Sequence, residues 1–275
     1  MLERFRYINH INEVIEFGSG GIFANQNDLR DFSWDMSTRN GKITSFSRGV
    51  VSKTIPVVVL SNKATELKNR IFEVCEKDVQ AMQHGRIIIG DYYLRCFVTA
   101  SQKSNYLPSR KHTELALTVS TDSPYWIKET KTTFGYGIVS EGTNLDFNND
   151  FAYDYTSNML GKELNNTGFM PANFKMLIYG PAENPSVKIG GHAYTVNVSV
   201  ARNEYLAIDS ISKTVILKHT DGAETNCLNL RDKDSYIFEK IPAGVNLVSI
   251  TGDFKFDVTL LEERSEPNGF NACKQ

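Results

Sequence analysis

Apolar and polar side chains alternate through residues 185–217 in a pattern that strongly limits what this chain can fold into. Tyr194, Val196, Val198 and Val200 are separated by polar or small residues, and a period of two residues places them on one face of a β-strand. The alternation resumes at residues 205–208 and again at 213–217, after short polar turns. The pattern predicts an antiparallel meander, and therefore a β-sandwich or a barrel.

Residues 63–79 are the one long exception to this pattern. Leu67, Ile71, Val74 and Cys75 recur at the spacing of one helical face. The preceding residues 61–62 are Ser-Asn, which suit the start of a helix because their side chains accept hydrogen bonds from its free amides. The sequence therefore predicts a mainly β protein with one long helix.

Two dipeptides predict β-hairpin turns, Asn40-Gly41 and Gly90-Asp91. Residues 54–60 form an almost continuous apolar run, which predicts a strand that is buried on both faces. The polar residues 101–111 follow the second hairpin and predict a loop or an arm. Alternation in residues 235–241, 245–250 and 254–261 predicts three further strands.

The composition changes at residues 128–145, which are rich in Thr, Gly and Ser. We place a domain boundary there, which gives an N-terminal β-barrel or sandwich with one helix at 1–133 and a β-sandwich at 134–263. Residues 264–275 remain as a C-terminal tail that can return to the N-terminal domain.

Charge and hydropathy exclude several classes of protein. A net charge of -2 argues against a chain built to wrap nucleic acid. No apolar run approaches the roughly 20 residues of a membrane helix, and the N-terminus lacks the apolar core of a signal peptide, so we expect no membrane insertion. The four cysteines lie far apart in the sequence without a CxxC motif, which is typical of reduced thiols in a protein made in the cytoplasm.

No motif indicates catalysis, a cofactor or a metal site. Asp146, Asn148 and Asp150 begin like a calcium-binding loop, but Phe151 replaces the glycine and Ser157 the acidic residue that such a loop requires. The five histidines have no partner at metal-ligand spacing, and acidic residues that are close in sequence do not make the facing pair of a glycosidase. We therefore expect a protein that is not an enzyme.

Short blocks spread along the chain carry a family resemblance. They are FRYIN (5–9), DFSW (31–34), IGDYYL (89–94), FMPANF (169–174), IYGP (178–181), IGGHAYTVN (189–197), YLAIDSISKTVIL (205–217), YIFEKIPAG (236–244) and ERSEP (263–267). In this order they resemble the distal tail proteins of long-tailed phages and prophages. No single block is strongly specific, but their succession is, and it covers nearly the whole chain.

The resemblance implies a structural role at the tip of the virion tail, for a protein made in the cytoplasm of the bacterial host. Members of the family form a ring, usually a hexamer, whose channel is built by the N-terminal domain and from which a galectin-like C-terminal sandwich projects. The ring joins the tail tube protein to the tail-tip hub protein, and in many phages it carries receptor-binding proteins. DNA passes through such a ring without specific binding. Residues 134–263 have no room for the extra carbohydrate-binding module of enlarged members.

Two sets of residues are candidates for binding surfaces. Extended hairpins can add strands to the sheet of a neighbouring subunit, so we expect the ring interface near Gly90, Asp91, Gln102, Tyr106 and Arg110. The alternative function is a carbohydrate-binding module that recognises cell-wall glycan through the C-terminal sandwich. In that case Tyr153 and Tyr155 are candidate stacking platforms for sugar rings, although such aromatics more often belong to cores or interfaces.

Overall fold

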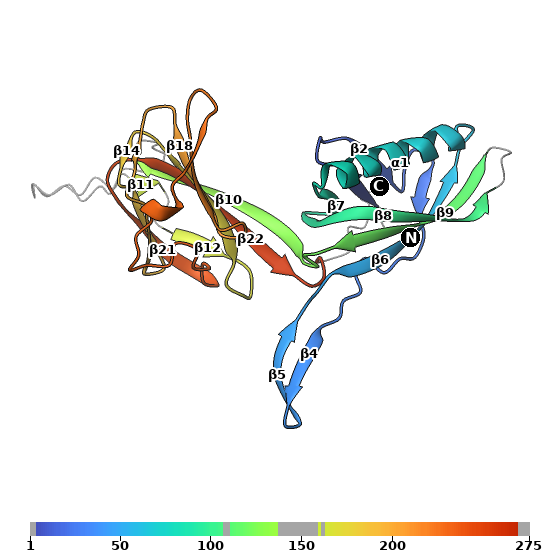
Figure 1. Ribbon diagram of the computed structural model, residues 1–275, viewed down its shortest axis with the longest axis horizontal. Coiled ribbons are helices and arrows are strands. Elements are labelled where there is room, and N and C mark those ends of the chain that lie inside the picture. Colours follow the sequence, from blue (N-terminus) through green and yellow to red (C-terminus); the bar gives the residue numbers. More distant parts are fainter. Residues whose placement is uncertain (1–3, 107–110, 137–158, 161–162, 269–275) are drawn as a thin grey trace, which may run out of the picture. The chain divides into compact units, whose positions relative to one another are not determined.

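The structure is a computed structural model that describes residues 4–106, 111–136, 159–160 and 163–268. The described chain is mainly β, as the alternating pattern predicts, with antiparallel sheets and one α-helix among these residues (Figure 1). It divides into two compact units: unit 1 is Met1–Lys128 with Glu263–Gln275, and unit 2 is Glu129–Glu262. Strands β10 (Trp126–Tyr136) and β22 (Lys255–Arg264) each contribute residues to both units.

Unit 1 contains two antiparallel sheets that share a strand. The other strands of this unit are β1 (Phe5–Ile8), β2 (Val14–Phe17), β3 (Ile22–Ala24), β4 (Asp35–Arg39), β5 (Lys42–Ser47), β6 (Val51–Leu60), β7 (Gly85–Ile89), β8 (Tyr92–Tyr106) and β9 (His112–Thr121). One sheet has the order β2–β1–β7–β8–β10 and the other β3–β6–β9–β8. Strand β8 belongs to both, because its first residues pair with β7 and its residues from Phe97 onward pair with β9. Its register with β9 shifts twice, and such bulges bend a strand from one sheet into the next.

Helix α1 (Ala64–Ala81) covers the core of unit 1, close to the range 63–79 that the sequence predicts. Ile71, Val74 and Cys75 are buried, and the helix contacts β2, β6 and β8. The predicted cap is wrong: Lys63 is the N-cap residue and no side chain caps the helix, since Ser61 accepts a hydrogen bond from the Lys63 amide, one residue before the helix begins. The core beneath the helix includes Tyr7, Leu29, Ile55, Leu94 and Trp126. In the described ranges, no helix combines the length and the apolarity that crossing a bilayer requires.

Two expectations for unit 1 are wrong in detail. Strand β6 is buried on one face only, since Ile55 and Val57 are buried while Thr54 and Leu60 are exposed. It lies between β3 and β9 in an antiparallel sheet whose other face meets solvent. Residues 101–106 are not a loop but the end of β8, paired with β9, and residues 107–110 lie outside the described residues.

Unit 2 is a β-sandwich. Its strands, besides most of β10 and β22, are β11 (Met159–Leu160), β12 (Glu163–Asn166), β13 (Asn173–Tyr179), β14 (Ala182–Glu183), β15 (Ser186–Ile189), β16 (His192–Thr195), β17 (Ser199–Val200), β18 (Tyr205–Asp209), β19 (Thr214–Lys218), β20 (Glu224–Asn226) and β21 (Gly244–Thr251), with a short 3₁₀ turn η1 (Leu228–Leu230). One sheet has the order β10–β22–β13–β18–β19–β20, the other β12–β21–β15–β16. Phe174, Met176, Val187, Tyr194 and Phe256 fill the core from both sheets.

The predicted meander is correct for β18 and β19, which pair from Tyr205 opposite Lys218 to Asp209 opposite Thr214. It is wrong for residues 194–200, which are divided between β16 and β17. The Asn197 amide leaves the strand ladder to bond the carbonyl of Leu230, and β16 pairs with β15 in the second sheet. Alternation identifies a buried face, but it does not say which sheet of a sandwich a strand joins.

The strand predicted at residues 235–241 is also wrong. These residues are irregular apart from a turn at 237–238, and Ile241 makes only an isolated bridge with Ala172. Ile237, Phe238 and Ile241 are nevertheless buried in the core of the sandwich. Here the alternation reports burial and not strand pairing.

Candidate assembly surface

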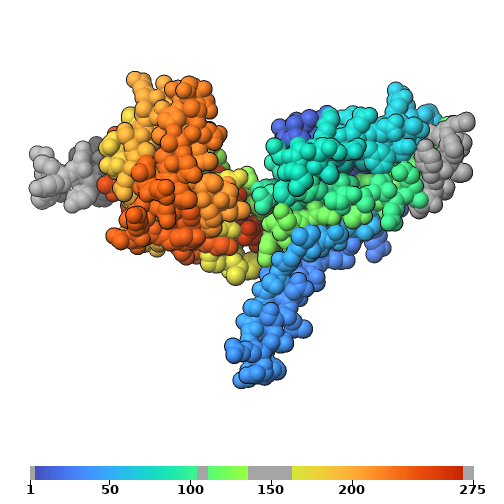
Figure 2. Space-filling view, viewed as in Figure 1, coloured from blue at the N-terminus to red at the C-terminus, as the bar shows by residue number. Residues whose placement is uncertain are grey.

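One hairpin of unit 1, formed by β4 and β5, is exposed along its whole length, and we call residues 35–47 the arm. Figure 1 shows the arm extending from the end of β6, and Figure 2 shows it standing clear of the rest of its unit. Its turn is the predicted Asn40-Gly41, with φ of 51° and 73°. Two consecutive left-handed residues give the tight turn whose twist matches a two-residue hairpin.

Large apolar side chains gather on one face of the arm. Met36 lies opposite Phe46, and these side chains are 63% and 59% exposed. The ring of Trp34 meets that of Phe46 edge to face, with centroids 6.5 Å apart. Residues that are directly opposite in an antiparallel pair share a face, so Trp34, Met36 and Phe46 form one apolar stripe.

A bulge extends this stripe toward the tip of the arm. The register shifts after the pair of Ser37 and Ser45, so that Ile43 lies opposite Thr38 and returns to the face of Met36. The extra residue, Thr44, donates its hydroxyl to the carbonyl of Ser37. The other face of the arm carries the small polar pair Ser37 and Ser45.

A two-stranded hairpin with no cover is marginally stable in water, and contiguous exposed apolar side chains mark surfaces that bind another protein. The arm combines both properties. Its geometry suits a projection that is completed by contact with a second protein surface.

Arg48 follows β5 directly and holds the base of the arm. Its guanidinium carbon lies 4.4 Å from the ring centroid of Trp34, 5.1 Å from that of Tyr125 and 5.5 Å from that of Phe32. Its Nε donates to the carbonyl of Ser33 at 3.2 Å, and its Nη1 donates to the carbonyl of Pro124 at 2.7 Å. Burial lowers the pKa of Arg48, yet an arginine in a protein stays charged. We call Phe32, Ser33, Trp34, Arg48, Pro124 and Tyr125 the arm root.

The segment before the arm is fixed to the body of unit 1 by a buried lysine. The Nζ of Lys53, on β6, donates to the backbone carbonyls of Asp28 and Asp31. Burial lowers the pKa of Lys53, and the carbonyl bonds replace the water that its ammonium loses. Arg30 in the same segment donates to the carbonyl of Pro267 at 2.9 Å. Residues 266–267 thus lie against the segment that precedes the arm.

The residues expected at a ring interface lie elsewhere in unit 1. Gly90 and Asp91 form the tip of the β7–β8 hairpin, where Gly90 has a φ of 58° and Asp91 is exposed. Gln102 pairs with Ala116 and Tyr106 with Thr113, so both belong to the β8–β9 ladder. Arg110 lies outside the described residues. These positions remain a proposal for the interface.

Sequence reasoning missed the arm as a functional element, although it identified the turn. Trp34, Ile43 and Phe46 read as apolar positions of ordinary core strands. A signal was present in their neighbours, because Ser37, Thr38 and Arg39 on one strand, and Lys42, Thr44 and Ser45 on the other, leave too little apolar surface to bury either strand.

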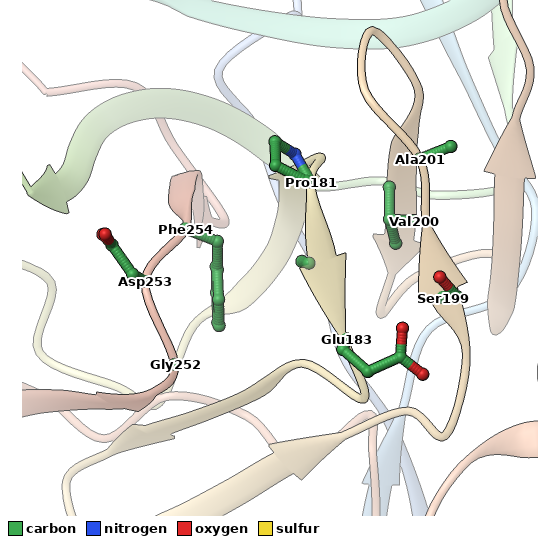
Figure 3. A pocket seen from close by; sticks show the side chains of 9 residues that line it. Pro181, Glu183, Ser199, Val200, Ala201, Gly252, Asp253 and Phe254 are labelled. Carbon is green, nitrogen blue, oxygen red and sulfur yellow. The ribbon is translucent and has the colours of Figure 1, made fainter.

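Unit 2 has an open depression of about 380 Å³ beside β14 and β17 (Figure 3). Pro181, Val200 and Phe254 contribute its apolar lining, and Glu183 and Asp253 its two carboxylates. Figure 3 shows these carboxylates directed away from each other. Glycoside hydrolysis needs two acids that face one another across the bond to be cleaved, and this pair does not fit that geometry.

The other site predictions concern residues with no described structure. The candidate glycan-stacking residues Tyr153 and Tyr155, and the calcium-like stretch 146–150, lie outside the described residues. Among the residues that are described, no group of three or more His, Cys, Asp or Glu side chains is placed to hold a metal ion.

The fold is shared with known tail proteins. Neither a scan against protein-family models nor a search of curated proteins gives a match. Among solved structures, a chain of the phage p2 baseplate in its activated conformation with Ca matches with a TM-score of 0.62, 10% identity, and 97% and 100% coverage of the two chains. SPP1 Dit (gp 19.1), described as a paradigm of the hub adsorption apparatus in phages that infect Gram-positive hosts, matches with a TM-score of 0.56, 10% identity, and 94% and 99% coverage. The chain therefore has the fold of phage baseplate and hub proteins over nearly its full length.

Proposed function

We propose that this chain is a structural distal tail protein of a long-tailed phage or prophage. It forms a ring, with six copies as the expected number, that joins the tail tube protein to the tail-tip hub protein at the tip of the virion. The ring anchors receptor-binding proteins and lets DNA pass without specific binding. The protein is not an enzyme, and it is made in the cytoplasm of the host.

The observation that carries this proposal is the match of both units, in one chain, to baseplate and hub proteins. The low identity limits that match to the fold, so the arm supplies independent support. Its exposed apolar stripe belongs to a protein that binds another protein surface. In a cyclic ring every arm meets the same surface of its neighbouring subunit. A closed homo-oligomer can therefore bury the apolar stripe of every copy.

The test is the mass of the purified protein by light scattering, followed by electron microscopy of the same fraction. The expected particle has a central hole and a mass of about 186 kDa, six times the 31.0 kDa chain. If the protein alone is a monomer, the measurement is repeated in the presence of the tube and hub proteins of the same phage. A chain that stays monomeric with both partners would contradict the proposal.

The matched control replaces residues 35–47 by a short Gly-Ser linker. Every side chain of the arm is exposed, so the core of unit 1 keeps its contacts in this variant. We expect the deleted form to remain folded and to lose the ring. Saturable binding of cell-wall polysaccharide by a form that never assembles would favour the carbohydrate-binding alternative instead.

A further inference from the structure

The arm is connected to unit 1 by only two stretches of chain, one entering β4 and one leaving β5. A ribbon attached in this way can swing, because no strand of the body pairs with it in the described structure. Contacts at the arm root therefore decide whether the arm points in one direction before it meets a partner. An arm fixed in advance loses less conformational freedom on binding, and this loss is a main cost of association.

Arg48 joins three segments of chain at the root: its own, which leaves β5, and two others that it contacts. It leaves β5, bonds the Ser33 carbonyl on the stretch that enters β4, and bonds the Pro124 carbonyl that precedes β10. The aromatic rings around it come from the same segments, Phe32 and Trp34 from the entering stretch and Tyr125 from the body. Trp34 and Tyr125 also touch each other edge to face, with centroids 6.3 Å apart.

The chemistry of this cluster requires an arginine. The planar guanidinium can stack on aromatic faces while its N–H groups, which lie in the plane of the guanidinium, donate to carbonyls. The ammonium of lysine cannot make both kinds of contact at once. The Nη2 atom of Arg48 is buried and has no hydrogen-bond partner among the described residues. A buried donor left unpaired is unfavourable, so the remaining contacts of this side chain must outweigh that loss.

We propose that Arg48 is a positioning residue, which locks the arm in its assembly-competent direction through the aromatic rings and backbone carbonyls of the arm root. This inference rests on the proposed ring function and assigns to it a residue outside the contact surface. It separates two roles. The stripe of Trp34, Met36, Ile43 and Phe46 contacts the neighbouring subunit, whereas Arg48 fixes the direction in which the arm projects.

The experiment compares the full-length protein with Arg48→Ala and Arg48→Lys. Ring formation is followed as a function of protein concentration by light scattering, with the tube and hub proteins present if closure needs them. We expect Arg48→Ala to raise the concentration at half-assembly at least about tenfold and to reach a ring of normal size at high concentration, because only the cost of ordering the arm has changed. Arg48→Lys keeps the positive charge but lacks the planar set of N–H donors. Its concentration at half-assembly should therefore lie between those of the wild type and Arg48→Ala.

A second readout reports the arm directly. The chain has two tryptophans, and Trp126 is buried whereas Trp34 lies at the root. In the unassembled protein, Arg48→Ala is expected to lower the fluorescence anisotropy of Trp34 and to raise its quenching by acrylamide. A loss of general stability would not change these signals while the protein stays folded. Tyr125→Ala removes the body's ring with Arg48 in place and gives the same result if Arg48→Ala does not fold.

The matched control is Arg86→Ala, which removes an exposed arginine 6.0 Å from the ring centroid of Tyr93, away from the arm. It should leave both readouts unchanged. The inference is overturned if Arg48→Ala assembles within twofold of the wild-type concentration, or if Trp34 shows no gain in mobility. If the arm-deleted protein also assembles like the wild type, the proposed role of the arm is wrong as well. If only Arg48→Ala assembles normally, the role of Arg48 is wrong while that of the arm stands.

Discussion

The hydroxyl of Tyr7 donates a hydrogen bond to the carboxylate of Asp78, which joins the first strand of unit 1 to the last turn of α1 across 71 residues of chain. Both side chains are buried, and Asp78 also accepts from the backbone amide of His10 at 2.9 Å. Burial, with this hydrogen bond, raises the pKa of Tyr7 well above its ordinary value, so its hydroxyl stays protonated and available as a donor.

Tyr7→Phe should therefore destabilise unit 1 without changing its surface. It removes one partner of a buried carboxylate, which costs about 1–3 kcal/mol of the free energy of unfolding. Urea denaturation measures this loss. Glu66→Gln alters the exposed ion pair with Lys63 at the start of the same helix and serves as the control, for which we expect little change. Equal losses in the two variants would contradict the role assigned to Tyr7.

Gly85 lies against the same pair and cannot carry a side chain. A Cβ at this position would clash with the Tyr7 hydroxyl and with the Asp78 carboxylate. Gly85→Ala should lower the free energy of unfolding by about 1–3 kcal/mol, because the buried network must shift to admit a methyl group. Gly49, at the base of the arm, has open space around it and gives the matched control. Gly85→Ala unfolding at the same urea concentration as Gly49→Ala would exclude this close packing.

Substitutions on the apolar face of the arm should weaken assembly, whereas substitutions on its polar face should not. Met36→Thr with Phe46→Thr removes the centre of the apolar stripe and keeps side chains that suit a strand. We expect an unchanged melting temperature and ring formation weakened at least tenfold, since buried aromatic anchors dominate interface energy. Ser37→Thr with Ser45→Thr alters the opposite face and is expected to assemble normally. Sedimentation velocity measures the assembly of both double variants. Normal rings from the Met36→Thr, Phe46→Thr variant would exclude the stripe as the contact surface.

Asp257 makes the stability of unit 2 depend on acid. Burial alone would raise the pKa of this carboxyl, but hydrogen bonds from Lys131 at 2.7 Å, Tyr179 at 2.6 Å and Thr133 at 2.7 Å hold it below its ordinary value. The folded pKa is thus lower than the unfolded one of about 3.9. The stabilising contribution is fully present above that value and is lost as pH falls through the folded pKa.

Asp257→Asn should accordingly flatten the dependence of unfolding free energy on pH below about pH 5, measured by urea titrations at successive pH values. Asp253→Asn, an exposed carboxylate on the neighbouring turn, is expected to leave the slope unchanged. The same slope in wild type and Asp257→Asn would show that this cluster does not govern acid stability.

The sequence predicted those features that depend on local chemistry. Helix α1 followed from the spacing of Ile71, Val74 and Cys75, and the arm's turn from Asn40-Gly41. It could not predict sheet membership, since Tyr194 and Leu206 alternate alike but lie in different sheets. The contacts of the arm root could not be predicted for a related reason. Arg48 and Tyr125 are 77 positions apart, and no pattern in the sequence around either residue indicates that they meet. The family resemblance led to the fold, whereas the surface that suits assembly required coordinates.

Strands β10 and β22 bear on how this protein withstands force. Unit 2 is an insertion in the chain of unit 1, entered along one strand and left along the other. These strands are hydrogen-bonded neighbours in one sheet. A pull on unit 2 is therefore divided between two covalent tethers, and a protease that cuts one of them leaves the module attached by the other. Such redundancy protects the attachment of unit 2 from a single break.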